Sequence, residues 1–440
     1  KGIERFAVIS RNAVVGNAGA PVDIAVCGDR ITALAAGLRC EAVEVVDARG
    51  AFAFGGFADS HVHLDKACIL DRCSICEGTL AEAVRETTGA KRDFTESDVY
   101  ARAARVVESA ITHGTTRMLS FVEIDPRAGF RSFDALKRIR SDYAFAIDIT
   151  LCAFAQEGLT QEPETFGMLD RALADGADLV GGCPYTDPDP VRHVAMIFDL
   201  AQKHDVAVDF HLDFSLDPDR SDLAAVIAET IRRGYAGRVS VGHVTNLSAM
   251  EPDRLEARGR QLAEAGIALT TLPATDLFLN GRDADRLVPR GVAPVHRLAE
   301  QGVATAIATN NVLNPFTPYG DASLIRMANL YANVAQLSRR DDLERVFSFV
   351  AETAAGIMGQ TAALTVGGEA TIVLLDALGP ADAVQRVSRV IGGWHRGRRS
   401  FWNGYPEIFH TGTGGLQKSF SADTVSHPKL QGQEVAADDT

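Results

Sequence analysis

The segment Gly55-Gly56-Phe57-Ala58-Asp59-Ser60-His61-Val62-His63-Leu64-Asp65-Lys66 predicts a buried β-strand that ends in two histidines. Alternate side chains of a strand point to one face, so His61 and His63 can share one metal ion. A bare His-x-His pair on an exposed strand is more simply explained as two incidental histidines. Here small and apolar residues precede the pair, and buried polar rings need partners, which favours a metal site.

The same arrangement recurs along the chain, because His211 and His243 also end apolar runs. Eight such runs alternate with helical patterns between residues 55 and 364, which predicts a (β/α)8 barrel of the TIM type with its active site at the carboxyl ends of the strands. His61, His63, His211, His243 and Asn310 all fall at such ends. The runs are the one before His61, Arg117–Val122, Ala144–Ile149, Leu179–Gly182, Val206–Phe210, Val239–Gly242, Ile267–Leu272 and Val303–Ala308.

The two ends of the chain carry a different, β-type alternation. We expect residues 1–54 and 365–410 to form one small β domain together, since neither stretch alone buries enough apolar surface to be stable. Residues 55–364 form the barrel in this scheme. Residues 411–440 are polar and without periodicity, which predicts a tail.

Composition excludes several classes of partner. The formal net charge of −14 disfavours nucleic acid. No apolar stretch reaches the roughly 20 residues that span a bilayer, and no signal-peptide core follows Lys1–Arg5, so we expect a cytoplasmic protein that binds a small molecule. Seven cysteines fit reduced thiols better than a disulfide framework. The lone Cys73-Ser74-Ile75-Cys76 pair lacks a second pair at zinc-finger spacing.

Six segments together resemble the amidohydrolase superfamily, in particular the cytosine deaminase-like branch that includes N-isopropylammelide amidohydrolases. The resemblance implies one divalent ion held by His61, His63, His211 and a residue at the end of the last barrel strand, and three nitrogen ligands suit zinc, iron or other metals. It also implies that Gln156 binds a heterocycle, that His243 polarises the reacting water, and that the chain is a homo-oligomer. The segments are Gly56–Lys66, Ala153–Gly158, Asp209–Asp213, Gly242-His243, Leu279–Arg282 and Asn310–Phe316.

This sequence departs from that family at the chemistry itself. Asn310-Asn311 stands where the family has its metal-binding aspartate, so Asn310 is expected to ligate only through its carbonyl oxygen and Asn311 to contact substrate. The alternative is a turn in which Asn adopts left-handed geometry. Phe214 replaces a proton-shuttling glutamate and Phe121 a site histidine, so both are expected to contact the substrate ring, although a lone Phe usually packs in a core.

Other carboxylates are candidates for the lost proton transfer. Asp65 and Asp213 each lie two positions beyond a histidine and share its face if the strand continues. Together with His243 they form the expected catalytic set, while Glu123 and Asp276 are weaker candidates. For each carboxylate the alternative is a purely structural role, in which it accepts a hydrogen bond from Lys66 or from a neighbouring backbone amide.

The sequence therefore predicts a metal-dependent hydrolase of a non-peptide C–N bond, either a deaminase or a cyclic amidohydrolase, acting on a small nitrogen heterocycle. One alternative is a lyase or isomerase that uses His243 on the same scaffold without hydrolysis. Another is a catalytically silent binding protein that keeps the cavity.

Overall fold

The computed structural model describes residues 6–16, 19–39 and 41–407. The predicted tail, residues 411–440, lies outside the described residues, as does Cys40. The other six cysteines are free thiols. None of the described helices is long and apolar enough to cross a membrane.

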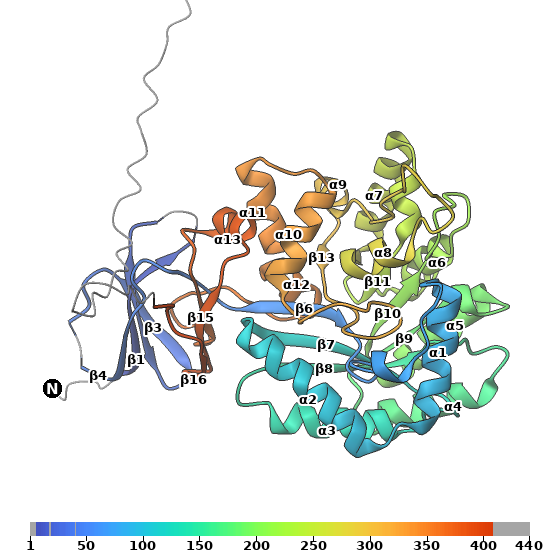
Figure 1. The fold of residues 1–440 in the computed structure, drawn as a ribbon, viewed down its shortest axis with the longest axis horizontal. Coiled ribbons are helices and arrows are strands. Elements are labelled where there is room, and N and C mark those ends of the chain that lie inside the picture. The colour runs from blue at the N-terminus through green and yellow to red at the C-terminus, as the bar shows by residue number, and fades with distance from the viewer. Residues whose placement is uncertain (1–5, 17–18, 40, 408–440) are drawn as a thin grey trace, which may run out of the picture. The chain divides into compact units, whose positions relative to one another are not determined.

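Eight parallel strands form the nearly closed barrel that the sequence predicts (Figure 1). Their side chains are buried almost throughout, as expected for parallel strands covered on both faces. The last strand returns to the first through a single parallel bridge between Val62 and Asn310. The strands, in sheet order, are β6 (Phe57–Val62), β7 (Thr115–Glu123), β8 (Asp148–Ala155), β9 (Leu179–Gly182), β10 (Ala207–Leu212), β11 (Val239–His243), β12 (Ile267–Thr271) and β13 (Thr305–Ile307).

The predicted strand Ala144–Ile149 is displaced, and this boundary is a correction. Residues up to Ile147 form a turn after the preceding helix, in which the amides of Ala146 and Ile147 donate to the carbonyl of Tyr143. The strand starts only at Asp148, where it pairs with β7. The displacement places Gln156 directly after the strand end.

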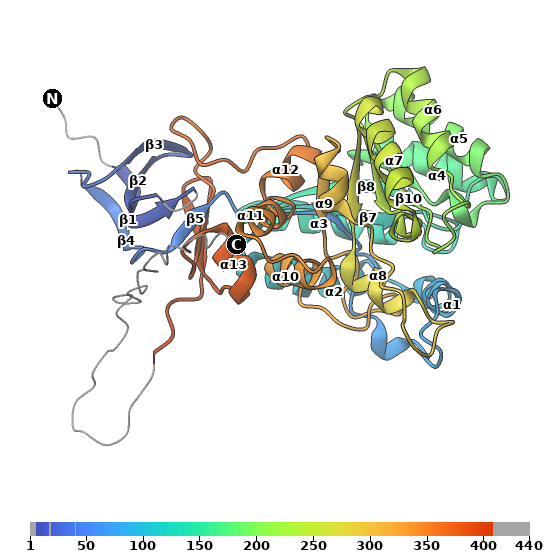
Figure 2. The same cartoon turned by 90° about the horizontal axis from the view of Figure 1, so that it is seen from above.

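Helices follow the strands and surround the barrel (Figures 1 and 2). Four of the described helices, α8, α9, α12 and α13, are only six or seven residues long, and the 3-10 turn η2 (Lys91–Asp93) lies between α1 and α2. The helices are α1 (Leu80–Ala90), α2 (Glu96–Thr112), α3 (Arg131–Asp142), α4 (Pro163–Ala174), α5 (Pro190–His204), α6 (Leu223–Arg233), α7 (Pro252–Ala265), α8 (Pro273–Leu279), α9 (Val295–Glu300), α10 (Leu324–Val334), α11 (Arg340–Ser348), α12 (Glu352–Ile357) and α13 (Pro380–Arg386).

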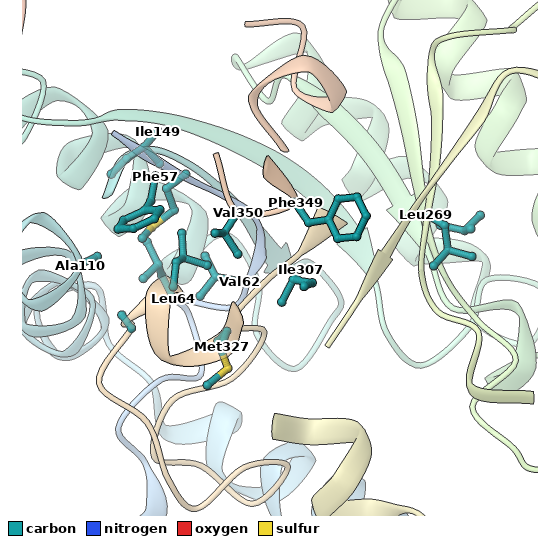
Figure 3. Close-up of a cluster of buried hydrophobic side chains, with 14 of the residues drawn as sticks. Phe57, Val62, Leu64, Ala110, Ile149, Leu269, Ile307, Met327, Phe349 and Val350 are labelled. Atoms are coloured by element: carbon teal, nitrogen blue, oxygen red, sulfur yellow. The ribbon is translucent and has the colours of Figure 1, made fainter. Parts of the chain in front are cut away.

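The core holds β6 in position, and with it the two histidines. Phe57 and Val62 of this strand are fully buried and belong to one cluster with Ile307, Met327 and Val350 from the end of the barrel (Figure 3). Each fully buried side chain of this size contributes roughly 1.5–3 kcal/mol. The first barrel strand, which carries His61, is thus held in place by side chains from the last part of the barrel.

A second sheet is built from both ends of the chain, as predicted. Its order is β16-β15-β14-β5-β1-β2-β3, with β4 paired to β1. The carboxyl-terminal segment also contains α13, which contacts α10 and α11, so 365–410 is not purely β. The exact domain limits stay a prediction. The strands are β1 (Phe6–Val15), β2 (Val22–Cys27), β3 (Arg30–Ala35), β4 (Ala42–Asp47), β5 (Phe52–Phe54), β14 (Ile372–Leu375), β15 (Val390–His395) and β16 (Arg398–Trp402).

Candidate active site

Three histidines from two barrel strands converge on one point. The Nε2 atom of His211 lies 3.2 Å from Nε2 of His61 and 2.9 Å from Nε2 of His63. Burial, followed by the neighbouring positive charges, lowers the pKa of all three imidazoles well below its ordinary value. The rings are therefore neutral, and neutral imidazole nitrogens are common metal ligands.

The rings are held by packing. Phe121 lies with its centroid 4.3 Å from that of His61 and 5.3 Å from that of His63, and Phe154 lies 4.2 Å from His211. The Nδ1 atoms of the three histidines have no hydrogen-bond partner among the described residues. Phe121 thus packs against the rings of His61 and His63, and it is not among the described residues that line the cavity.

Asn310 lies between the two histidines of the first strand. Its backbone amide donates to the carbonyl of His61, and its carbonyl accepts from the amide of His63, both at 2.8 Å. Its φ is +59°, which is the left-handed geometry of the turn alternative, while ligation of a metal through its side-chain oxygen stays a prediction. Its side-chain Nδ2 donates to Thr275 Oγ1 at 3.0 Å. The buried Oδ1 has no hydrogen-bond partner among the described residues.

His243 is hydrogen-bonded to a carboxylate that was only a weaker candidate in the sequence. Its Nδ1 lies 2.7 Å from Oδ1 of Asp276, which is fully buried on α8. Burial raises the pKa of Asp276, and the nearby His243 opposes that rise. Asp276 fixes the Nδ1 proton, so His243 presents the lone pair of Nε2 and can accept a proton there.

The two predicted catalytic carboxylates face other partners. Asp213 accepts hydrogen bonds from the Ser221 hydroxyl at 2.5 Å and the Asp222 amide at 2.8 Å. Asp65 accepts from the backbone amides of Lys66 at 2.9 Å and Glu123 at 2.8 Å. Neither lines the cavity. The structural alternative for these carboxylates therefore fits the geometry.

A narrow cavity of about 10 Å³ opens onto His63, His211 and His243. Gln156, Asn310, Asn311 and Phe214, all predicted from the sequence, are on its wall. None of its described lining residues is acidic. The remaining lining residues were missed: Lys66, Leu80, Tyr185, Thr275, Leu279 and Phe316. Only Lys66 carried a usable signal, because it closely follows a strand end at the catalytic face of a barrel.

Lys66 brings a cation to the cavity. Its Nζ donates to Glu123 Oε1 at 2.7 Å and to Gln156 Oε1 at 3.4 Å, and it lies 4.4 Å from the ring centroid of Phe316. Glu123 also accepts from the buried Lys91 at 3.0 Å. Burial alone raises the pKa of Glu123, but the two lysines outweigh it and lower the pKa to about 2. Lys66 thus joins the buried Glu123 to the wall of the cavity.

Phe214 forms part of the apolar wall. Its ring centroid lies 5.0 Å from that of His243, and it packs with Leu80, Leu279 and Phe316. The cavity thus has a polar side, which carries the histidines, Lys66 and Gln156, and an apolar side.

Comparison with known proteins agrees with this fold. The model of the amidohydrolase family matches residues 77–401, so the chain belongs to that family. Its members define a class of hydrolases that act on carbon–nitrogen bonds other than peptide bonds, and this chain is one of them.

Among its relatives, pterin deaminase from Rhizobium rhizogenes is 27% identical over 350 residues, covering 78% of this chain and 79% of that protein. N-isopropylammelide isopropyl amidohydrolase from Pseudomonas sp. is 24% identical over 388 residues, covering 86% and 93%. The crystal structure of 5-methylcytosine deaminase from Klebsiella pneumoniae with 5-fluorocytosine superposes with a TM-score of 0.86 at 25% identity, covering 91% of this chain and 99% of that one.

Proposed function

We propose that this protein is a metal-dependent hydrolase that removes an amino or substituted amino group from a small nitrogen heterocycle. The observation that carries the proposal is the convergence of three neutral histidine nitrogens at a cavity that also holds His243 and Gln156. The named activities of the relatives, on pterin, an ammelide and 5-methylcytosine, support the same class of substrate.

The residues present fit one divalent ion. His61, His63 and His211 would hold it through Nε2, and the unpartnered Oδ1 of Asn310 would be a weaker fourth ligand. Such an ion lowers the pKa of a water towards neutrality, with three nitrogen ligands suiting zinc or iron. With no carboxylate among these ligands, we expect it to be held less tightly than by an aspartate.

The chain's own residues supply binding and proton transfer. His243 accepts a proton at Nε2 and returns it to the leaving nitrogen, while Asp276 stabilises the imidazolium. Lys66 donates to a ring carbonyl or to an ionised ring oxygen, and the Gln156 amide contacts the same polar edge. Phe214 packs on the ring face. Roles for Asp65, Asp213, Phe121 and Asn311 in catalysis or substrate binding stay predictions.

The test is elemental analysis of the purified protein, followed by a screen of aminopyrimidines, amino-s-triazines and aminopterins for release of amine. We expect bound metal, release of ammonia or an alkylamine, and loss of turnover in His243→Ala. Protein without metal and without turnover on any of the three classes contradicts the proposal. Light scattering and fractionation test the expected homo-oligomer and cytoplasmic location.

A lyase or isomerase is the second candidate, favoured by Asn310 at the ligand position and by the absence of acidic residues among the described cavity lining. Turnover in oxygen-18 water separates the two. Hydrolysis must incorporate the label into the product, whereas a lyase or isomerase reaction does not.

A further inference from the structure

The cavity is too small for any heterocycle. Its volume of about 10 Å³ holds roughly one water, whereas sites for small ligands measure roughly 300–1,000 Å³. A wall of the cavity must therefore move before substrate binds. The question is which wall.

The apolar side of the cavity is a roof made of Leu80, Phe214, Leu279 and Phe316. Three of these residues belong to fixed parts of the site. Leu279 lies on α8, which carries Asp276. Phe214 follows Asp213, whose carboxylate is tied to Ser221 and Asp222.

Phe316 is also fixed, because its amide donates to the buried Asn314 side chain at 3.0 Å and its ring contacts Lys66. Leu80 differs from these three. It is the first residue of α1, which lies next to α8 at the edge of the ring of helices (Figures 1 and 2). The apolar contacts of α1 in this cluster are limited to Leu80, Ala83 and Val84.

We propose that residues 69–90, comprising α1 and the loop before it, form a lid that opens to admit substrate, with Leu80 as its contact to the substrate. The proposal takes this cavity as the substrate site and in that respect rests on the proposed function. Leu80 is the lining residue that this segment contributes, so it determines how much apolar bulk the closed site accepts.

The lid is internally connected. Glu82 accepts hydrogen bonds from the amides of Cys76, Glu77 and Gly78 at 2.7–2.9 Å. The Thr79 hydroxyl caps α1 by accepting from the Glu82 amide at 3.2 Å. The end of the loop and the first turn of the helix are thus one unit, which moves without losing its own hydrogen bonds.

Both ends of the lid are anchored. At its start, the amides of Ile69 and Leu70 donate to the carbonyl of Leu313 at 3.0 and 3.1 Å. At its end, Lys91 is buried and donates to Glu123, Asp125 and Glu157 at 2.6–3.0 Å. The anchors define two hinges, and the second is linked through Glu123 to Lys66 in the cavity.

Three kinds of contact hold the closed lid between the hinges. They are a bidentate ion pair from Arg72 to Asp98 on α2, the apolar contacts of the buried Ala83, and a hydrogen bond from the Thr88 hydroxyl to Glu157 Oε1 at 2.7 Å. Leu80 itself is only partly buried. Opening therefore breaks these contacts and keeps those of the two hinges.

Lysine acetylation read by peptide mass spectrometry tests the lid without measuring turnover. Lys66 and Lys91 are equally buried, at 2% and 1% exposure. Opening uncovers Lys66 in the cavity and leaves Lys91 in its hinge. We expect acetic anhydride to modify Lys66 at least tenfold faster than Lys91 and slower than the exposed Lys203. We also expect amides of α1 to exchange with deuterium faster than those of α2.

Leu80→Ala should raise the rate of Lys66 acetylation at least threefold, because the lid loses its apolar contact with Phe214, Leu279 and Phe316. The matched control is Leu287→Ala, at a leucine that is 97% exposed and outside the lid, which should leave the rate unchanged. Equal, slow acetylation of Lys66 and Lys91 with α1 exchange as slow as that of α2 would overturn the lid. The absence of turnover on every heterocycle, with Lys66 still accessible, would contradict the proposed function instead.

Discussion

Nδ1 of His243 and Oδ1 of Asp276 lie 2.7 Å apart in the barrel mouth, and both side chains are buried. This pair joins a carboxylate to a ring that can accept a proton, so we propose that it takes over the proton transfer for which Asn310 lacks an acid. The left-handed φ of +69° at His243 places the ring at the cavity wall, at the end of β11.

Asp276→Asn should lower kcat by about 10²–10⁴ while the fold is kept, since the amide keeps the volume but cannot stabilise an imidazolium. Steady-state kinetics on the best heterocycle of the screen measures this, with circular dichroism to confirm folding. Asp213→Asn is the matched control. If it lowers kcat equally in a stable protein, Asp213 carries the proton, as the sequence predicted.

Gly242→Ala should displace His61 and reduce bound metal. An added Cβ would lie 2.6 Å from Cε1 and 2.8 Å from Nδ1 of the His61 ring, closer than carbon contacts allow. Metal content after dialysis checks the prediction. Gly167→Ala, in α4 with no atom within 4 Å of the added carbon, should retain the native metal content.

The eight strands and the three histidines could be predicted because their signals are local. An apolar run that ends in a histidine predicts both a strand and the place where its last side chain lies. The strand predicted at Ala144–Ile149 starts too early, because its first residues form a turn after a helix. Phe145 in that turn is 61% exposed.

The partners of the site residues were not predictable, because they depend on contacts between distant parts of the chain. Asp276 lies 33 positions from His243. The surroundings of Lys66 are visible only once Glu123 and Lys91 are seen around it, and the contacts of Phe121 with the rings of His61 and His63 likewise depend on the fold. Leu80 carries no local signal, since a leucine at a helix start is equally common in any core.

Glu123→Gln should destabilise the protein strongly near pH 7, by about 3–5 kcal/mol, because it leaves Lys66 and Lys91 short of a buried partner. The pKa of Glu123 falls from the ordinary 4.5 to about 2 on folding. Its stabilisation is therefore complete above pH 4.5 and lost as pH falls towards 2.

Urea unfolding of native and Glu123→Gln protein at pH 7 and in steps down to pH 3 measures the difference. We expect the gap in unfolding free energy to narrow steadily below pH 4.5. Glu256→Gln, which removes an exposed ion pair with Arg297, should cost less than about 1 kcal/mol. A gap that is constant with pH would show that the charge of Glu123 does not stabilise the fold.

Asn310→Asp should strengthen metal retention without producing efficient cytosine deamination. The unpartnered Oδ1 of Asn310 already lies at the histidines, and a carboxylate there adds the negative charge that three neutral rings lack. Thr275 can turn its hydroxyl to donate to the new oxygen, since it now accepts from the Asn310 amide at 3.0 Å. Phe214 lies against His243 and cannot donate a proton to the substrate ring, and such acid assistance is typically worth about 10²–10⁴ in rate.

Metal content under a chelator and cytosine turnover should therefore respond differently to Asn310→Asp. The control is Asn311→Asp, which adds the same charge one position away. If the variant gains no metal over that control, Asn310 is not the fourth ligand; if the native protein already deaminates cytosine at ordinary enzyme rates, Asn310 and Phe214 have not redirected the site.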